Sequence, residues 1–449
     1  MGKYDLRNSI LEILIRIEKD TGYSHLLIDQ EIKTRDIPLK DHGLLTEIVY
    51  GTLQHKIRLD YYLEHFVNKK KKLDQWVRIL LRMSLYQMVF LDRIPDHAII
   101  HEAVEIAKSR GHKGIASMVN GVLRAVQRQG VPSINVIEDD TKRLAVETSH
   151  PEWLVRRWIK AYGYETTREM CRANTEHKPL SVRVQPLRIS REEAIHELAE
   201  QEFQVRPSSF SDQGLIIDKG NILHSSLFKQ GFLTIQDQSS MLVAEMLKLS
   251  QDMKVLDACS APGGKVTHMA EKMGDKGKIH AYDLHKKKIN LIDRKAEELQ
   301  LNIIDAAAKD ARKLQEVHQK KSFDRILVDA PCSGLGVIRG KPEIKYHKEE
   351  KDIRRLAEIQ LDILEEAAPL LKQDGLLVYS TCTVDKEENE EVVKKFLENN
   401  TGFIIDESFF EELPSMLQTS IGISDYGLQL FPQLFDTDGF FLTRFSRKN

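Results

Sequence analysis

Apolar residues recur at intervals of three and four through about the first 130 residues. The sets are Ile10, Leu14 and Ile17; Leu44, Leu45, Ile48 and Val49; and Val77, Leu80, Leu81, Leu85, Met88 and Val89. This spacing places the apolar side chains of each set on one face of a helix. The last set is apolar on nearly all sides, as expected of the central helix of a bundle. The pattern predicts an all-α domain over residues 1–130.

Shorter elements of mixed type follow. Residues 131–148 contain a proline and an acidic stretch and are predicted to be a linker. Residues 149–235 combine helical segments with stretches of alternating apolar and polar residues, which predict strands. Strands are expected over 180–184, 214–218 and 231–237, and a helix over 191–201. This order indicates a small α+β subdomain.

Strands and helices alternate regularly over residues 236–449. The predicted strands are 254–258, 278–283, 302–307, 323–329 and 375–380, and the predicted helices are 265–273, 285–300, 350–371 and 387–399. This α/β alternation is typical of a doubly wound, mostly parallel sheet covered by helices. The final stretch, 439–445, alternates without an intervening helix and is predicted to be an antiparallel edge strand.

Composition restricts the class of protein. Of the 449 residues, 41% are hydrophobic and 30% are charged, which is typical of a globular chain. The formal net charge is −2, so contacts with nucleic acid have to come from local patches. The basic run Lys69–Lys72 is a candidate, although a solvated loop explains it as well. Because the chain lacks a membrane-spanning apolar run and the apolar core of a signal peptide, we expect a cytoplasmic protein without membrane contact.

Cysteine and histidine usage indicates neither a disulfide framework nor a metal site. The four cysteines lie far apart and form no C-x-x-C pair; they are Cys171, Cys259, Cys332 and Cys382. His97 and His101 stand one helical turn apart and could share a metal ion, but no third ligand is evident nearby. A solvated helix start is preferred for this pair. We therefore expect no metal, and thiols that are free for chemistry.

Residues 255–268 are the most informative stretch, because a short apolar strand breaks there into a glycine turn and then a helix. Pro262, Gly263 and Gly264 let the backbone turn sharply and leave its amides open to a ligand. Amides at a helix N-terminus suit a carboxylate, a ribose hydroxyl or a phosphate. A Walker A loop would need glycine at Cys259, and a dinucleotide fingerprint needs three spaced glycines, so neither fits. A cofactor loop is favoured over an ordinary strand-to-helix turn.

Acids and thiols follow the ends of several predicted parallel strands, which is where ligands of such sheets bind. They are Asp283, Asp310, Asp329, Cys332 and Cys382. Each acid alone is explained equally well as a helix cap or a surface charge, but an adenosine-type cofactor explains Asp283 and Asp310 together. A single buried cysteine usually serves packing. Two cysteines just beyond strand ends favour reactivity.

Two resemblances to known families refine these expectations. Residues 41–53, 80–88 and 119–124 resemble the RNA-binding NusB-type helical domain, although Asp-His-Gly at 41–43 departs from the usual Asp-Arg-Ala. The sequences Asp-Ala-Cys-Ser-Ala-Pro-Gly-Gly-Lys at 257–265, Asp-Ala-Pro-Cys-Ser-Gly at 329–334 and Ser-Thr-Cys-Thr at 380–383 resemble S-adenosylmethionine-dependent RNA cytosine-C5 methyltransferases. The small departures are Ser260 where alanine is usual and Val266 where threonine is usual.

The resemblances imply a fold, a cofactor and a partner. The fold is a Rossmann-like class I methyltransferase domain, preceded by the small α+β subdomain and the NusB-like domain. The cofactor is S-adenosyl-L-methionine. The combination of domains resembles bacterial methyltransferases of small-subunit ribosomal RNA, which implies an RNA partner, either naked or partly assembled. We expect a monomer.

The second resemblance also implies residue roles. Cytosine C5 is a poor nucleophile, so a thiolate first adds to C6, and C5 then attacks the methyl group. Cys382 is implied to be this nucleophile, and Cys332 to assist proton removal and release. Asp329 would hold the N3/N4 edge of cytosine and Lys265 would lie near the base. A helix beginning near Asp385 would favour the thiolate form of Cys382.

Cofactor contacts follow from the same family. Those implied are Cys259, Ser260, Ala261, Pro262, Gly263, Gly264 and Lys265 for the methionine part, Asp283 for the ribose, Asp310 for the adenine, and Asp329 close to the sulfonium. The basic segment 339–348 is explained equally well as a solvated loop and as a flexible lid over a flipped base.

Competing interpretations differ in their chemistry. In a mechanism of the DNA-methylating type, Cys332 would be the attacking thiol. Methylation of an amino group would call for an Asn/Asp-Pro-Pro-aromatic loop where Asp-Ala-Pro-Cys stands. A noncatalytic RNA-binding or antitermination factor would use the helical domain and keep the rest as scaffold. Retention of both thiols, the lysine and the acids disfavours this last alternative.

Overall fold

The computed structural model describes residues 6–20, 22–67 and 73–448, and these residues pack into two units. The first unit comprises the described residues up to Glu176 together with Ile338–His347, and the second comprises His177–Val337 and the described residues from Lys348 onward. The basic run Lys69–Lys72 lies outside the described residues. The predicted division into domains at 130, 148 and 235 stays a proposal.

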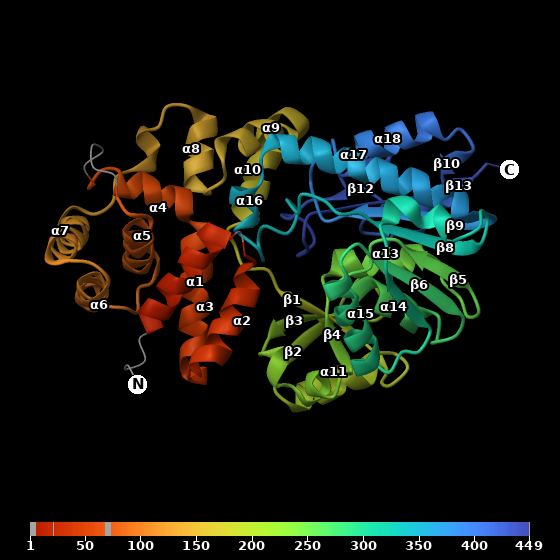
Figure 1. Ribbon diagram of the computed structural model, residues 1–449, viewed down its shortest axis with the longest axis horizontal. Helices are drawn as coiled ribbons and strands as arrows, with labels where there is room; N and C mark the ends of the chain where they lie inside the picture. Colours follow the sequence, from red (N-terminus) through yellow and green to blue (C-terminus); the bar gives the residue numbers. More distant parts are fainter. Residues whose placement is uncertain (1–5, 21, 68–72, 449) are drawn as a thin grey trace. The chain divides into compact units, whose positions relative to one another are not determined.

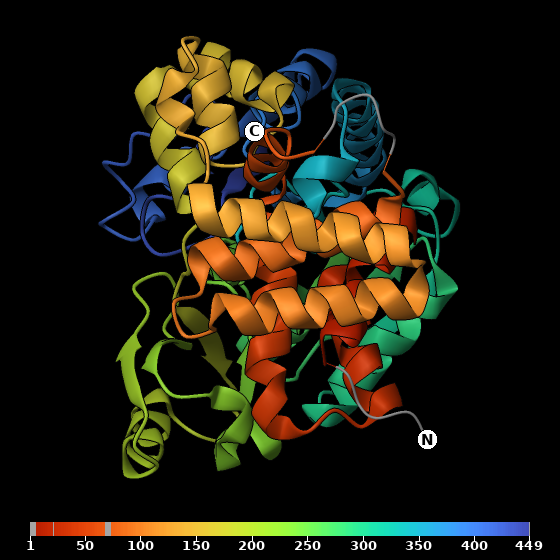
Figure 2. The same cartoon turned by 90° about the vertical axis from the view of Figure 1, so that its left-hand side faces the viewer.

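Helices build the first unit as described, and Figure 1 colours them from red to yellow except for α16, which is cyan. Their bounds are α1 (Leu6–Asp20), α2 (Ser24–Arg35), α3 (Leu39–Gln54), α4 (Lys56–Leu63), α5 (Gln75–Phe90), α6 (Asp96–Arg110), α7 (Lys113–Gln129), the 3-10 turn η1 (Ile134–Val136), α8 (Asp140–Glu147), α9 (Glu152–Tyr162), α10 (Tyr164–Ala173) and α16 (Ile344–His347). In Figure 2, α6 and α7 run side by side in orange.

Helix α5 is the centre of this bundle, as its all-round apolar pattern predicts. Residues from Val77 to Gln87 are almost all buried, and α1, α3, α4, α6 and α7 pack around the helix. Arg82, a charged residue of this buried run, pairs with Asp60 and Glu18 at 2.7 and 2.6 Å. A buried cation is tolerated only with such partners. The predicted all-α domain is confirmed.

The range 131–148, expected to be a linker, contains regular structure. Helix α8 occupies residues 140–147, and Asp139 caps its N-terminus by accepting from the backbone N of Lys142 at 2.8 Å. Leu144 and Val146 are buried. The acidic residues that suggest a linker therefore belong in part to a helix cap, which is a favoured place for them.

Residues 339–348 also differ from expectation, because they form neither a solvated loop nor a flexible lid. Glu343 accepts from the backbone N and the Oγ of Ser24 at 3.0 and 3.1 Å. Lys345 is fully buried, and its Nζ donates to the carbonyl O of Gln54 at 3.1 Å. Specific buried partners outweigh the basic composition of this segment, which belongs to the first unit as far as His347.

The small subdomain that opens the second unit contains an antiparallel sheet with strand order β2-β3-β1-β4. Its elements are β1 (Leu180–Val184), α11 (Arg191–Glu200), β2 (Gln204–Pro207), β3 (Gly214–Lys219), the 3-10 turn η2 (Ile222–His224), α12 (Ser226–Lys229) and β4 (Leu233–Ile235). The predicted α+β subdomain is confirmed, and β2 is a strand that the sequence pattern does not reveal.

The remainder of the second unit is a mixed sheet with helices on both faces (Figure 1). Its elements are α13 (Gln238–Met246), β5 (Lys254–Asp257), α14 (Gly264–Lys272), β6 (Lys278–Asp283), α15 (Lys286–Glu298), β7 (Ile304–Ala308), η3 (Ala311–Glu316), β8 (Phe323–Asp329), α17 (Glu350–Ala367), η4 (Ala368–Leu370), β9 (Leu371–Thr381), α18 (Glu390–Asn399), β10 (Phe403–Ile405), α19 (Ser408–Glu412), β11 (Ile423–Ser424), β12 (Gly427–Leu430) and β13 (Phe440–Arg447). The predicted doubly wound α/β fold is confirmed.

The strand order of this sheet is β11-β12-β13-β9-β8-β5-β6-β7, with β10 also paired to β13. Strands β9, β8, β5, β6 and β7 are parallel, so their carboxyl ends meet at one edge. Strand β13 is antiparallel to β9, as predicted. It is not an edge strand, however, because β12 pairs with its other side.

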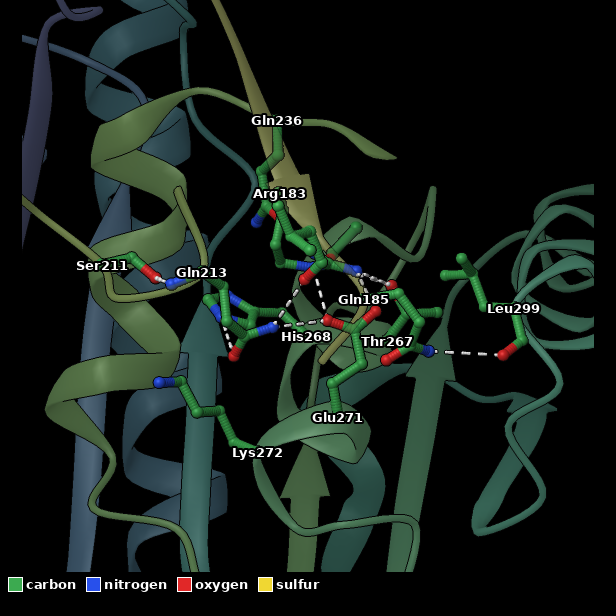
Figure 3. A network of polar contacts seen from close by, with 12 residues as sticks. Arg183, Gln185, Ser211, Gln213, Gln236, Thr267, His268, Glu271, Lys272 and Leu299 are labelled. Carbon is green, nitrogen blue, oxygen red and sulfur yellow. Dashed lines mark hydrogen bonds and ion pairs between the residues drawn. The ribbon is translucent and has the colours of Figure 1, made fainter. Parts of the chain in front are cut away.

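A buried polar network joins the small subdomain to α14, the helix after the glycine loop (Figure 3). Arg183 of β1 donates from Nε and Nη2 to the two carboxylate oxygens of Glu271 at 2.7 and 2.8 Å. It also donates to the carbonyl O of Gly264 at 2.8 Å and to Thr267 Oγ1 at 3.0 Å. Gln213 donates to Glu271 at 2.8 Å. The start and the middle of α14 are thus held by one arginine.

None of the described helices is both long enough and apolar enough to cross a membrane.

Replacement of Arg183 by methionine should be strongly destabilising. The change leaves the Glu271 carboxylate buried without its charged partner, which typically costs about 3–5 kcal/mol. The double variant Arg183→Met/Glu271→Met should recover most of that loss, because neither charge is then buried alone. Urea unfolding followed by circular dichroism measures both free energies. Additive losses in the double variant would contradict this account of the pair.

Lys345 should make the stability of the protein depend on pH. Burial lowers the pKa of Lys345 to about 7, below the value of roughly 10.4 in an unfolded chain. The unfolded state therefore binds more protons between these two values, and the cost of burying Lys345 falls as pH rises.

The variant Lys345→Met should remove this dependence. Its stability advantage over the wild type should shrink by about 1 kcal/mol for each pH unit between roughly pH 7 and 9.5, as measured by urea unfolding. The neighbouring His55 and His150 do not titrate in this window, since burial lowers the pKa of both. A difference between variant and wild type that is constant with pH would refute the assignment.

Candidate active site

The glycine loop connects β5 to α14 at the carboxyl edge of the parallel sheet. Gly263 has φ +103°, which favours glycine, and a Cβ there would lie 3.3 Å from the Cα of Ile292. The backbone N of Ser260 donates to the carbonyl O of Tyr282 at 2.7 Å, so the loop is tied to the end of β6. Helix α14 begins at Gly264, directly after the turn. The loop thus presents a helix N-terminus at the strand ends, as predicted.

Four acids converge on this loop from separate strand ends. Burial is the main factor that raises the pKa of Cys259 well above its usual value, and the carboxylates of Asp257, Asp329, Asp283 and Asp310 add to the effect. All four charges therefore act on one thiol within the loop. The structure brings together the two acids that the sequence links to an adenosine-type ligand.

Asp283 and Asp310 have local partners as well. Asp283 Oδ1 accepts from the backbone N of His285 at 3.0 Å. Asp310 caps η3 by accepting from the backbone N of Arg312 at 3.0 Å, and the hydrogen bond from the Arg312 side chain lowers the pKa of Asp310. The interpretation of Asp310 as a helix cap is therefore confirmed. Its proposed contact with the adenine of a cofactor stays a prediction.

The two thiols beyond β8 and β9 lie side by side. The Sγ atoms of Cys332 and Cys382 are 3.3 Å apart. The backbone N of Ala330 donates to the carbonyl O of Ser380 at 2.9 Å, and that of Gly336 donates to the carbonyl O of Cys382 at 3.0 Å. The two loops are therefore joined by backbone hydrogen bonds on either side of the thiol pair.

The two thiols are not equivalent. The hydrogen bond with Cys382 and burial together raise the pKa of Cys332 well above its usual value. The Cys332 thiol therefore holds its proton more firmly than an isolated cysteine does. Helix α18 begins at Glu390, so the expectation of a helix N-terminus near Asp385 beside Cys382 is wrong; turns occupy the intervening residues.

A partly buried ion pair lies at the same edge. Lys265 Nζ donates to Asp329 Oδ2 at 2.9 Å, and Ser380 Oγ donates to Asp329 Oδ1 at 2.8 Å. Burial alone would lower the pKa of Lys265, but Asp329 raises it overall, so the ammonium form is stable. The ammonium also faces the ring of Phe440 at 5.3 Å from its centroid. Lys265 and Asp329, predicted separately, thus form one unit.

Asp257 is a candidate site residue that is not among the acids predicted from the strand ends. It is the last residue of β5 and is fully buried. Burial raises the pKa of Asp257 to about 7, and the charge of Asp329 adds to this effect. Its position directly before the glycine loop is the signal that could have identified it.

A cavity of about 260 Å³ adjoins these groups. The predicted site residues that line it are Cys259, Ser260, Ala261, Pro262, Gly264, Lys265, Asp329 and Cys382. The predicted residues Gly263, Asp283, Asp310 and Cys332 are not among the residues that line the cavity. Further lining residues include Asp257, Lys295 and Phe440. The cavity joins the glycine loop to one of the two thiols.

Metal ligands do not assemble in the part of the chain that the structure describes, since no group of three or more His, Cys, Asp or Glu side chains there could hold an ion.

Models of three protein families match successive parts of the chain. The NusB family matches residues 5–128, the ferredoxin-like domain of RsmF/B-like methyltransferases matches residues 150–223, and the family described as 16S rRNA methyltransferase RsmB/F matches residues 244–446. The last range contains the glycine loop and both thiols.

Solved structures support the fold. The crystal structure of PH0851 has a TM-score of 0.83 and 27% sequence identity, and the match covers 99% of each chain. A methyltransferase homolog protein from Pyrococcus horikoshii has a TM-score of 0.59 and 25% identity, over 70% of this chain and 100% of its own.

Relatives with named functions match over the full length. The probable ribosomal RNA small subunit methyltransferase B of Bacillus subtilis (strain 168) is 50% identical over 448 residues, with 100% of both chains covered. The ribosomal RNA small subunit methyltransferase B of Pseudomonas putida is 34% identical, with 90% of each chain covered. The chain therefore belongs to the RsmB/F family of small-subunit ribosomal RNA methyltransferases and is a methyltransferase.

Proposed function

We propose that the protein transfers a methyl group from S-adenosyl-L-methionine to C5 of a cytosine in 16S ribosomal RNA, through a transient covalent bond between Cys382 and C6. The observation that carries this proposal is the thiol pair. Two cysteines lie 3.3 Å apart just beyond neighbouring parallel strands, and Cys382 lines the same cavity as the glycine loop. The proposed nucleophile, Cys382, and the glycine loop proposed to bind the methyl donor thus line the same cavity.

The thiol pair suits a reaction with two proton-transfer steps. The Cys382 thiolate adds to C6, which places electron density on C5 so that C5 can bond to the methyl carbon. Removal of the C5 proton then lets the sulfur–C6 bond break, which restores the aromatic base and the thiolate. We assign Cys332 to the removal and release steps, because its Sγ lies 3.3 Å from that of Cys382 and is therefore near the base that Cys382 would hold.

Lys265 and Asp329 are suited to holding the base beside Cys382. Charge-assisted hydrogen bonds fix the directions in which this partly buried ammonium–carboxylate pair is oriented. Asp329 accepts from both Lys265 and Ser380, so its orientation is set before a ligand arrives. We propose that Asp329 receives the N3/N4 edge of cytosine and that Lys265 lies near the same ring.

The residues of the loop fit S-adenosyl-L-methionine, which supplies an electrophilic methyl group when bound. Residues 259–265 offer backbone amides at the N-terminus of α14 for the methionine part. We assign Asp283, at the end of β6, to the ribose hydroxyls and Asp310, after β7, to the adenine amino group, because both follow the carboxyl ends of parallel strands. The acids around Cys259 are complementary to a sulfonium cation.

Two of the alternative functions considered from the sequence are disfavoured. Membership of a methyltransferase family disfavours a noncatalytic RNA-binding or antitermination factor. Attack by Cys332 is disfavoured because Cys382 lines the cavity beside the glycine loop and Cys332 is not among the residues that line it.

The target nucleotide is the finer part of the proposal. We propose cytosine 967 of 16S ribosomal RNA, the target that the resemblance of the whole chain implies; the names of the relatives support small-subunit ribosomal RNA as the substrate. We propose that the protein acts as a monomer in the cytoplasm, on RNA that is unassembled or partly assembled, with the NusB-like helices contributing to RNA binding.

Trapping with RNA that contains 5-azacytosine should identify the nucleophile. This base accepts the thiol and the methyl group but lacks the C5 proton, so the adduct cannot be released. The wild type and Cys332→Ala should each give a covalent RNA–protein band on a denaturing gel, and Cys382→Ala should give none. The reverse pattern would assign the attack to Cys332, and the absence of any band from the wild type would reject the covalent mechanism.

Bisulfite sequencing of 16S ribosomal RNA should reveal the target in cells. Cells that lack the protein should lose protection of the cytosine 967 position, and the wild-type protein should restore it. Cys382→Ala should fail to do so although it accumulates to the same level. Unchanged protection in cells without the protein would show that another enzyme modifies that base.

A further inference from the structure

Glu388 holds the Cys332 loop, and neither the sequence motifs nor the family resemblance assigns it a role. Its Oε2 accepts from the backbone N of Ser333 at 2.8 Å and from Nε2 of Gln360 at 2.8 Å. The same Gln360 nitrogen donates to the carbonyl O of Pro331 at 3.0 Å. Glu388 and Gln360 therefore fix the residues on both sides of Cys332. Both side chains are fully buried.

Asn389, the next residue, holds the Cys382 loop in the same way. Its Oδ1 accepts from Thr381 Oγ1 at 2.6 Å, and its Nδ2 donates to the carbonyl O of Thr383 at 3.2 Å. These are the two neighbours of Cys382. Nδ2 also donates to Oε1 of Gln429 at 2.8 Å, which sets the orientation of the amide. Asn389 is fully buried as well.

We propose that Glu388 and Asn389 are positioning residues, each of which aligns one thiol of the pair with the cytosine. Because the two are adjacent in the chain, a single stretch of backbone before α18 sets both loops relative to one another. The proposal rests on the covalent mechanism given above, in which the two thiols act at different steps. Misplacing Cys382 should then impair formation of the covalent adduct, and misplacing Cys332 should impair its release.

Glutamine is a faithful substitute for Glu388. Burial raises the pKa of Glu388 to about 7, so its carboxyl group is readily neutral. A glutamine oxygen can accept from Ser333 and Gln360 as the carboxyl oxygen does. The variant Glu388→Gln therefore keeps the positioning contact, and Glu388→Ala removes it. Glu391→Ala, on the exposed face of α18, is the matched control.

Two RNA substrates distinguish formation of the covalent adduct from its release. With ordinary in vitro-transcribed 16S ribosomal RNA and S-adenosyl-L-methionine, Glu388→Ala should accumulate covalent adduct to about ten times the wild-type level, because release is slowed. With 5-azacytosine RNA, it should form adduct at the wild-type rate. Asn389→Ala should form adduct roughly tenfold more slowly on the 5-azacytosine RNA and accumulate none on the ordinary RNA.

The controls make the outcome decisive. Glu388→Gln and Glu391→Ala should behave as the wild type on both RNAs, and thermal melting should show that all variants are folded at the assay temperature. Equal slowing of formation by Glu388→Ala and Asn389→Ala would overturn the proposal, as would accumulation in Glu388→Gln. If the wild type forms no adduct on 5-azacytosine RNA, the proposed function itself is at fault, which is a different result.

Discussion

The parallel pairing of β8 with β9 is the constraint on which the site depends. Its register places Asp329 opposite Ser380, so the chain leaves both strands at the same level. The following turns bring Cys332 and Cys382 within 3.3 Å. Because side chains alternate between the faces of a sheet, a slip of one residue would reverse every side chain of one strand. The strand register therefore determines that the two thiols lie close together. The hydrogen bond from the backbone N of Gly336 to the carbonyl O of Cys382 continues the pairing into the loops beyond the strands.

Buried ionic groups hold the glycine loop against this sheet edge. Arg183 engages Glu271 with two hydrogen bonds and also reaches the first carbonyl group of α14, at Gly264. Charges are retained in a protein interior only when their hydrogen-bonding groups are satisfied. The small subdomain therefore supports the loop through a contact that has little freedom to rearrange. The Lys265–Asp329 pair applies the same principle next to the thiols.

Much of this arrangement could be predicted from sequence, because it follows from local periodicity and from the geometry of parallel sheets. Strands β6 and β8 have the predicted bounds, and the strand-end rule finds Asp329 and both thiols. What depends on distant partners was not predictable. The sequence around Lys345 does not distinguish it from the other basic residues of its segment. Its burial depends on the hydrogen bond to the carbonyl O of Gln54, which is distant in the sequence. Glu388 likewise lies in an acidic stretch that a solvated helix start would explain equally well.

The acids around the glycine loop act on the Cys259 thiol and on a cation in opposite directions. Asp257, Asp283, Asp310 and Asp329 create a negative field that raises the pKa of Cys259. Such a field favours the binding of a sulfonium cation and disfavours a thiolate nearby. A cation bound among these carboxylates offsets the field, so the site becomes more favourable to a thiolate once the donor is in place. Under the proposed mechanism, this charge distribution favours an order in which the donor binds before the nucleophile is activated.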